Sequence, residues 1–457
     1  RVAALRIVNT ADSTDTVELV TPGDDRRDPM IGLIERITTR LRAIRSEEER
    51  STLAYISSQD YSADDDTIRV YISIPHLTGI FIPENLKSRR YLITREIGME
   101  IGEPFDLAKA IDAIDNLYGT NLYDHVYADI QPYEGGVGLG YRLKERDFSI
   151  LRIGLKYDEY HSAEGRVSLS RDNMFGFGNQ LNTVFQAGRR TRLLMAENRL
   201  DRVYDWAFTF NIRAFQNRMV RPVYQGRTTY YDYEDERWGM ILSVGQVMDK
   251  LGNVVVQLKS ETSIIHPEKS SGVKNTQREF RSFIIRSLID SYDRYPFPRN
   301  GTLNVFYLEN TGEVFGGTER FVKLFWSTTV VRTLARKHTF TGSVSFGTAD
   351  PSIPESDYFS LGGGPTRLNC YNIDSSTSLF FAAFPGLAHH ELTGSRLASG
   401  LLSYRLFIPR FFYLEFTYGA GNVWRSGQTI RADTLLQCYG VKGQFDTYFG
   451  QLSAGWG

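Results

Sequence analysis

Apolar and polar residues alternate with a period of two along most of the chain after residue 147. The run from residue 151 to 158 reads LRIGLKYD, and similar runs recur near residues 204–213, 256–261, 339–346 and 402–408. This is the pattern of a β-strand whose two faces meet different surroundings. A soluble β-sandwich also alternates, but we do not expect its outer face to be so aromatic. The pattern predicts a mainly β fold, a transmembrane antiparallel β-barrel over residues 147–457 with one face on lipid and one on a polar lumen.

Residues 1–146 have a different pattern. Residues 68–146 predict one small α+β domain of strand, helix, helix, strand and strand, in that order, at residues 68–82, 91–101, 107–118, 126–131 and 137–143. Before it, Asp28 and Pro29 are a favourable N-cap and first helical residue. Apolar residues at helical spacing then predict an amphipathic helix to residue 45. We therefore assign residues 1–67 to a helical segment and linker, a candidate tail of an upstream domain.

Composition supports the barrel. The 457 residues are 41% hydrophobic, but the mean hydropathy is −0.31. No window holds 18 uninterrupted apolar residues, which argues against a helical membrane span. The 26 Tyr, 28 Phe and 40 Gly suit a chain of many short amphipathic strands. The net charge of −1 gives no reason to expect a nucleic-acid partner.

Two segments rich in Gly and Pro interrupt the alternation, SYDRYPFPRNGT at residues 291–302 and LGGGPTRLNCY at residues 361–371. They resemble the barrel of the outer-membrane insertase superfamily (BamA, TamA and two-partner-secretion proteins). That family reads roughly Y-D-x-R-x-x-P-x-x-G-T at the first segment. At the second it has G-G-x-x-x-x-R-G-Y, in a loop folded back into the barrel. The resemblance selects a turn motif of Asp293, Arg294, Pro298 and Gly301 and a barrel-lumen loop motif of Gly362, Gly363, Arg367, Asn369 and Tyr371.

Further segments extend the resemblance. Residues 172–178 are similar to D-N-L-F-G-x-G, residues 421–424 read GNVW, and residues 102–105 and 116–126 resemble a POTRA domain. The resemblance implies a bacterial outer-membrane protein with residues 1–146 in the periplasm and a POTRA domain at 68–146. The POTRA sheet edge either recruits a client or passenger strand or is only part of a rigid spacer. At about 20 residues per strand we expect about 16 strands, the last beyond Gly457.

The chain departs from the insertase pattern at one luminal pair. Asn369 and Cys370 stand where the family has Arg and Gly, and Gly419 stands where it has the Asp partner. Arg367 could replace the Arg, with Glu415 as its luminal partner. Segments 367–371, 384–387 and 404–405 are similar to barrels fused to a patatin-like phospholipase. This favours the membrane anchor or translocation part of a patatin-like protein, and the alternative is an insertase-type assembly or translocation factor.

Signals for chemistry are weak. The chain has no G-x-S-x-G, so we expect no hydrolase site in it and no enzyme activity of its own. His389, His390 and Glu391 are adjacent in sequence and predict an exposed polar loop rather than a metal site. We therefore expect no catalytic residue, no cofactor and no metal. The expected partners are outer-membrane lipid and a client or passenger polypeptide at the POTRA edge, with no nucleic acid.

Overall fold

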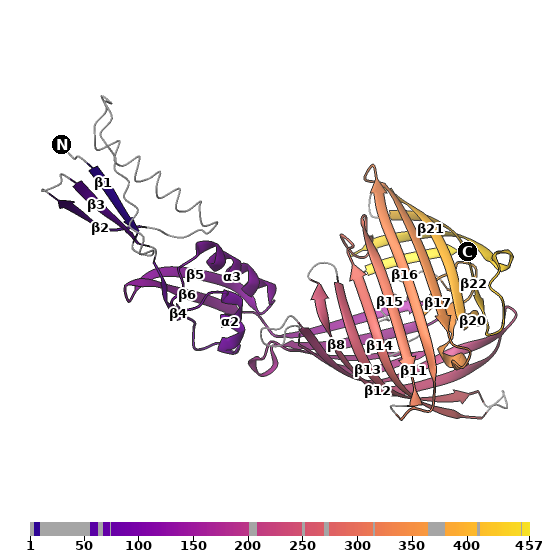
Figure 1. Cartoon of the computed structure of the whole chain (residues 1–457). Coiled ribbons are helices and arrows are strands. Elements are labelled where there is room, and N and C mark those ends of the chain that lie inside the picture. Colours follow the sequence, from indigo (N-terminus) through magenta and orange to yellow (C-terminus); the bar gives the residue numbers. More distant parts are fainter. Residues whose placement is uncertain are drawn as a thin grey trace. The chain divides into compact units, whose positions relative to one another are not determined.

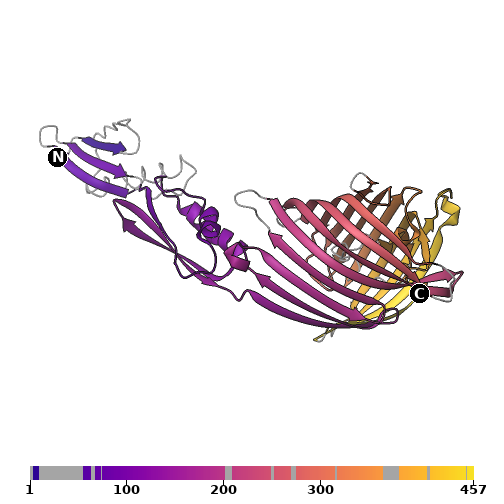
Figure 2. The same ribbon diagram turned by 90° about the horizontal axis from the view of Figure 1, so that it is seen from below.

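The computed structural model describes residues 4–9, 55–62, 67–73, 75–200, 208–248, 252–268, 274–313, 316–363, 380–408, 412–448 and 450–457. The chain divides into two compact units, shown in Figures 1 and 2. The N-terminal unit comprises Arg1–Phe148 and Asp172–Gly178, and the barrel unit comprises Ser149–Arg171 and Asn179–Gly457. The helix predicted at residues 28–45 lies outside the described residues.

The N-terminal unit contains two three-stranded sheets with the same connectivity. In each, the third strand lies in the centre, parallel to the first and antiparallel to the second. The strands of the first sheet are β1 (Ala4–Asn9), β2 (Tyr55–Ser62) and β3 (Thr67–Ser73). Those of the second are β4 (Leu77–Phe81), β5 (Tyr123–Tyr133) and β6 (Gly136–Glu145). Strands thus occupy part of residues 1–67, and β3 crosses the domain boundary predicted at residue 68.

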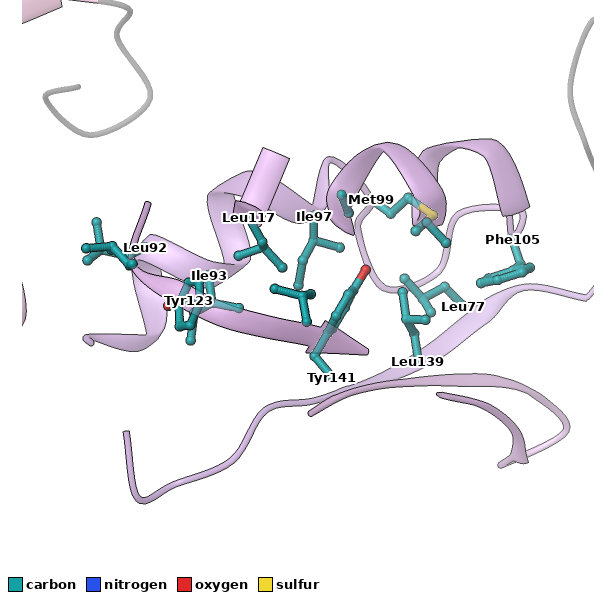
Figure 3. Packing of buried hydrophobic residues seen from close by; sticks show 14 of the residues in the cluster. Leu77, Leu92, Ile93, Ile97, Met99, Phe105, Leu117, Tyr123, Leu139 and Tyr141 are labelled. Carbon is teal, nitrogen blue, oxygen red and sulfur yellow. The ribbon is translucent and has the colours of Figure 1, made fainter. Parts of the chain in front are cut away.

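Two helices, α2 (Arg90–Ile97) and α3 (Leu107–Gly119), follow β4 along the chain. Together with strands β4 to β6 they form a unit called here the second module. Helix α3 begins where the sequence predicts, because the Asp106 carboxylate caps it by accepting hydrogen bonds from the backbone N–H groups of Ala108 and Lys109 at 2.9 and 3.4 Å. Its buried face carries Ala110, Ala113 and Leu117, at the spacing of one helical stripe. These residues join a compact apolar core with side chains of α2 and of strands β4 to β6 (Figure 3).

The barrel unit is built on a 15-stranded sheet in which β8 neighbours β9 and the other thirteen neighbouring pairs are antiparallel. The mainly β fold expected from the alternation is therefore confirmed. In chain order the strands are β7 (Ser149–Asp158), β8 (Ser162–Asp172), β9 (Gln180–Gly188), β10 (Thr191–Leu200), β11 (Phe208–Gln225), β12 (Thr228–Met248), β13 (Gly252–Pro267), β14 (Thr276–Asp290), β15 (Gly301–Thr311), β16 (Phe321–Leu334), β17 (His338–Ala349), β21 (Arg396–Ile408), β22 (Phe412–Trp424), β23 (Leu436–Thr447) and β24 (Gly450–Trp456).

The two faces of this sheet have opposite chemistry. On neighbouring strands, the outward side chains of Trp238 and Leu258 are 40% and 49% exposed. The inward side chains of Arg237 and Lys259, one position away, are only 1% and 5% exposed. Apolar residues therefore face outward and charged residues are buried inside, as a lipid-embedded barrel requires. None of the described helices is long and apolar enough to cross a membrane.

The segment between β17 and β21, residues 350–395, is called here the inserted segment. Its described part holds η4 (Glu355–Asp357), β18 (Phe359–Leu361), β19 (Phe381–Ala382) and β20 (Leu392–Gly394). Strand β18 pairs with both β19 and β20. The rings of Phe359 and Phe380 stack on the inward ring of Phe325 from β16, with centroids 6.2 and 4.4 Å apart. The inserted segment therefore packs on the inner face of the barrel. Two further short helices are η1 (Met174–Gly176) and η6 (Ala432–Thr434).

Candidate functional site

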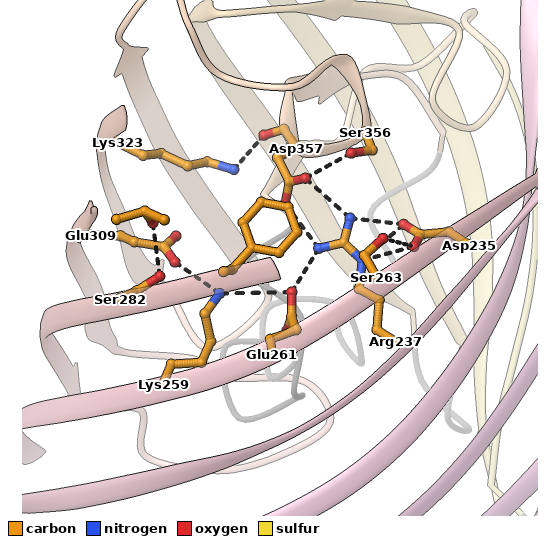
Figure 4. Close-up of polar contacts among 12 residues, drawn as sticks. Asp235, Arg237, Lys259, Glu261, Ser263, Ser282, Glu309, Lys323, Ser356 and Asp357 are labelled. Atoms are coloured by element: carbon orange, nitrogen blue, oxygen red, sulfur yellow. Dashed lines mark hydrogen bonds and ion pairs between the residues drawn. The ribbon is translucent and has the colours of Figure 1, made fainter. Parts of the chain in front are cut away.

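Charged side chains gather at one level of the barrel interior (Figure 4). The luminal ionic cluster is defined here as Asp235 and Arg237 of β12, Lys259 and Glu261 of β13, Glu309 of β15, Lys323 of β16 and Asp357 of η4. None of these residues is more than 5% exposed. Four barrel strands thus contribute charges to one buried site, and the seventh charge comes from the inserted segment.

Arg237 is the centre of this cluster. Its Nη1 and Nη2 donate to Oδ1 and Oδ2 of Asp357 at 2.9 and 3.2 Å, a bidentate pair between the barrel wall and the inserted segment. Its Nε donates to the Asp235 carboxylate at 2.9 Å, and Nη1 also donates to Oε1 of Glu261 at 3.0 Å. One guanidinium therefore serves three buried carboxylates, and its planar fork forms a bidentate pair with one of them, which a Lys ammonium cannot form.

Lysines extend the cluster along the wall. Lys259 Nζ lies 2.8 Å from Oε1 of Glu309, and Lys323 Nζ donates to the backbone carbonyl of Asp357 at 2.5 Å. Glu309 and Lys323 are direct register partners on β15 and β16. Arg221 of β11 closes the other side, because it donates to Asp235 at 2.9 Å and to the backbone carbonyl of Ser356 at 2.8 Å.

The cluster fixes the inserted segment by electrostatics. Both the carboxylate and the carbonyl of Asp357 and the carbonyl of Ser356 are bound by cations of the wall. Withdrawing η4 would leave Arg237 and Lys323 buried without these partners, which is costly in a medium of low dielectric. The arrangement can hold a segment in place or release it. We call this contact the Arg237–Asp357 lock.

The loop motif begins next to this lock. Gly362 and Gly363 are buried and have positive φ of 135° and 81°. A Cβ at Gly362 would lie 2.1 Å from the carbonyl oxygen of Ala388, and one at Gly363 would lie 2.6 Å from the His389 ring. Only glycine fits this close reversal. The other predicted loop residues, Arg367, Asn369 and Tyr371, lie outside the described residues.

Comparison with known families identifies the fold. The model of the Omp85 superfamily domain matches residues 173–457. The chain belongs to the Omp85 superfamily. The chain is also 22% identical, over 306 residues, to the outer membrane protein assembly factor BamA of Nitratidesulfovibrio vulgaris (strain Hildenborough). That alignment spans 63% of this chain and 37% of the relative.

Two solved structures have the same overall fold as this chain. BamA from Haemophilus ducreyi lacking POTRA domains 1–3 superposes with a TM-score of 0.72 at 12% identity, covering 99% of this chain and 95% of that one. CdiB from Acinetobacter baumannii gives a TM-score of 0.52 at 13% identity, covering 98% and 84%. The resemblance to the insertase superfamily is therefore confirmed. The protein is located in the bacterial outer membrane, with residues 1–146 in the periplasm.

The turn motif of this Omp85 barrel forms a closed connection between β14 and β15. The Asp293 carboxylate accepts hydrogen bonds from the backbone N–H groups of Arg299 and Asn300 at 2.8 and 3.1 Å. Arg294 Nε donates to the carbonyl of Phe297 at 2.8 Å. A Cβ at Gly301, where φ is 122°, would lie 2.3 Å from the carbonyl of Ser291. These motif residues therefore shape the turn itself.

Arg405 contacts both the turn motif and Glu415, two predicted sites that the sequence gave no reason to connect. Its Nη2 donates to the carbonyl of Pro298 in the turn motif at 2.5 Å. Its Nη1 lies 3.9 Å from Oε2 of Glu415, its register partner on β22. The ring of Phe297 stacks on Tyr413 at 4.2 Å beside it. The predicted Arg367–Glu415 pair stays a prediction, and the described partner of Glu415 is Arg405.

The two histidines lie at a contact within the Omp85 barrel and not on an open polar loop. His390 Nδ1 is 2.7 Å from the hydroxyl of Ser360, and the His389 ring stacks on Tyr160 at 4.7 Å. Across the described residues there is no group of three or more His, Cys, Asp or Glu that could hold a metal ion. Cys438 is buried as a free thiol, and Cys370 lies outside the described residues.

Proposed function

We propose that this Omp85 barrel is an assembly or translocation factor that acts on polypeptide clients at the outer membrane. The observation that carries the proposal is strand β7. Among the described residues, β7 is an edge strand that pairs with β8, and its other edge is where the strand expected beyond Gly457 would meet it at the seam of the barrel. Its outward side chains include Ile153, Leu155 and Tyr157, which suit contact with lipid. A client strand that pairs there enters a sheet already facing lipid.

The N-terminal unit supports the same proposal. We assign residues 68–146, which contain the second module, to a POTRA domain. We assign the first sheet to a further module of the same topology, because both sheets have the strand order 1-3-2. In the second module β5 is an edge strand, and its Tyr127 and Ile130 are 56% and 45% exposed. Such an edge in the periplasm can hold an extended client by strand addition. The chain has no catalytic role of its own in this proposal.

The Arg237–Asp357 lock gives the barrel a closed interior in this proposal. Because the described part of the inserted segment packs on the inner face of β12 to β16, we propose that a client reaches lipid along the wall and not through a water-filled pore. The relative from Nitratidesulfovibrio vulgaris is named an outer membrane protein assembly factor, which supports the assembly function in this proposal. Loss of the lock is expected to loosen the inserted segment before it disturbs the wall strands.

The anchor of a patatin-like enzyme remains the other function that the sequence favours. Its first signature, Arg367–Tyr371, lies outside the described residues. A second, Tyr404 and Arg405, has a structural explanation, since Arg405 holds the turn motif and Glu415. An upstream G-x-S-x-G in the complete reading frame would select the anchor. Without it, the assembly or translocation function is favoured.

A cross-linking experiment tests the client route. The full chain is reconstituted in lipid vesicles with p-benzoyl-phenylalanine in place of Leu155 on β7, and an unfolded small outer-membrane β-barrel polypeptide is added. The matched control carries the same probe in place of Trp238, an outward residue of β12 that is 40% exposed. We expect light-dependent adducts with the client at position 155 and few at 238. Equal yields, or no adduct at either position while the barrel is folded, would contradict the proposal.

A further inference from the structure

The outer wall of the barrel carries a groove of about 670 Å³ across β16, β17, β21, β22 and β23. Its volume lies in the range of roughly 300–1,000 Å³ that is typical of ligand sites. The side chains that line it face lipid, since Phe340, Leu402 and Tyr439 are 48%, 66% and 64% exposed. Gly342 is the register partner of Leu402 and leaves the space over its own strand unfilled. The groove is therefore an open apolar depression in the lipid-facing surface.

One end of the groove is closed by a row of rings. Phe340, Tyr404 and Phe416 are successive register partners on three strands, with ring centroids 5.3 and 6.5 Å apart. The Tyr404 hydroxyl is 2.7 Å from Nδ1 of His338. Aromatic rows of this kind mark the interface between the hydrocarbon and the headgroups. The groove thus runs from the headgroup level into the hydrocarbon.

Basic residues stand at the same end. Arg332 is the register partner of Phe340 and the only charged residue among those that line the groove. It makes no ion pair with any described residue. The turn that follows it, from β16 to β17, adds the exposed Arg336 and Lys337. Positive charge at the edge of the hydrocarbon attracts an anionic headgroup.

The direction of the strands identifies the leaflet. Strand β7 begins directly after the periplasmic residues 1–146, β7 and β8 are antiparallel, and so are the neighbouring pairs from β9 to β17. The neighbouring strands β8 and β9 are joined by residues 173–179 alone, which is too short for a parallel crossover. The turns after β8, β10, β12, β14 and β16 therefore all lie at the periplasmic end. Arg332, Arg336 and Lys337 consequently meet the periplasmic leaflet.

We infer that this groove binds one anionic phospholipid of the periplasmic leaflet. An acyl chain lies over Gly342 between Leu402 and Tyr439, and the headgroup phosphate is held by Arg332. Arg336 and Lys337 strengthen the attraction without contacting the acyl chain. The alternative is an ordinary aromatic girdle in which Arg332 only reaches towards the interface. Such a girdle would not distinguish an anionic phospholipid from a neutral one.

Native mass spectrometry of the full chain, titrated in detergent micelles, tests the site. The probes are dioleoyl-phosphatidylglycerol and dioleoyl-phosphatidylcholine. We expect the first bound phosphatidylglycerol to bind at least five-fold more tightly than phosphatidylcholine. Arg332→Gln should remove about five-fold of that affinity, and a variant that also carries Arg336→Gln and Lys337→Gln should remove the rest of the preference.

A glycine pair tests the acyl part. Gly342→Leu fills the groove without a clash, because a Cβ there would meet only a Leu402 methyl group at 3.7 Å. Gly165→Leu is the matched control on the outer face of β8, where a Cβ would meet only a Leu155 methyl group at 3.8 Å. We expect weaker phosphatidylglycerol binding for Gly342→Leu alone. Equal affinity for both lipids, or phosphatidylglycerol binding unchanged by both Arg332→Gln and Gly342→Leu, would overturn the inference. Displacement of the bound lipid by a second copy of the chain would also overturn the inference.

Discussion

The core of the second N-terminal module and the interior of the barrel bury their side chains equally well, but with opposite chemistry. In the module, Leu77, Leu117 and Leu139 are all 0% exposed. In the barrel, Glu309 and Lys323 are 0% exposed and Arg237 is 1% exposed. The module lies in the aqueous periplasm, where removal of apolar surface from water stabilises the fold. The barrel wall faces lipid, which accepts apolar side chains, so that its polar groups must satisfy one another inside.

This difference determines how the stability of each unit responds to a substitution. An apolar core responds in proportion to the volume that is lost, because each contact is small and non-directional. A buried ionic cluster depends on balance, and the loss of one charge leaves its neighbours unpaired. We therefore expect single substitutions to lower the free energy of unfolding most in the barrel interior and less in the module core. The smallest change is expected for a polar group in the module core that has no partner among the described residues.

Arg237→Met tests the barrel side of the comparison. The change keeps an unbranched side chain but leaves the carboxylates of Asp235, Glu261 and Asp357 without their shared cation. We expect the free energy of unfolding to fall by about 3–5 kcal/mol. Urea unfolding of the full chain in lipid vesicles measures this loss, and limited proteolysis should show earlier cleavage within residues 350–395.

Two further variants check that the loss comes from the cluster. Arg142→Met removes an Arg from an ion pair with Asp129 whose side chains are 71% and 55% exposed, and it should cost less than about 1 kcal/mol. Adding Asp357→Asn to Arg237→Met should cost less than the sum of the two single changes, because the second removes one of the uncompensated charges. Strictly additive losses would show that Arg237 and Asp357 are not coupled.

Leu139→Ala tests the apolar side. Leu139 of β6 is fully buried in the module core, so its truncation should cost about 2–5 kcal/mol, from lost burial and the cavity left behind. Amide hydrogen exchange of β5 and β6 in the full chain measures the loss. Ile111→Ala on α3, where the side chain is 52% exposed, is the control and should change stability by less than about 0.5 kcal/mol. A loss below about 1 kcal/mol at Leu139 would mean that apolar packing does not dominate this module.

The barrel could be predicted from the sequence because its signal is local. Alternation at residues such as Trp238 and Leu258 reports the two faces of a strand without any knowledge of its neighbours. The signal for α3 was equally local, since its apolar residues recur at helical spacing within one short segment. The first sheet was not predicted, because β1 pairs in parallel with β3 across more than 50 residues. Such a pairing leaves no mark in either segment alone.

The candidate site could be predicted only in part for the same reason. The turn and loop glycines carried a sequence motif, and Gly301, Gly362 and Gly363 do occupy backbone positions that a side chain would block. The ionic cluster has no motif. Arg237 and Asp357 are 120 residues apart, and their contact depends on strand register and on the path of the inserted segment. Likewise, Arg405 could be matched to Glu415 only once β21 and β22 were known to be paired.

Tyr141→Phe tests the smallest effect, a polar atom inside the apolar core. Tyr141 is 2% exposed, and its hydroxyl has no hydrogen-bond partner among the described residues (Figure 3). Burial raises the pKa of this phenol from 10 to about 12. In the unfolded chain the phenol loses its proton near pH 10, while the folded module still keeps it. The stability of the module should therefore be constant below pH 10 and fall as the pH rises from 10 towards 12.

Removing the hydroxyl should act in two ways that separate packing from protonation. At neutral pH, Tyr141→Phe should stabilise the module by about 1 kcal/mol, because an unsatisfied buried donor disappears while the ring still fills its site. Between pH 10 and 12, the part of the stability loss that Tyr141 causes should disappear as well. Amide exchange of β6 in the full chain at pH 7, and unfolding midpoints at several alkaline pH values, measure the two effects. Tyr127→Phe is the control, since that side chain is 56% exposed and should change neither quantity. If Tyr141→Phe destabilised the module at neutral pH, the hydroxyl would have a partner such as a buried water, and the module core would be less purely apolar than the comparison with the barrel interior requires.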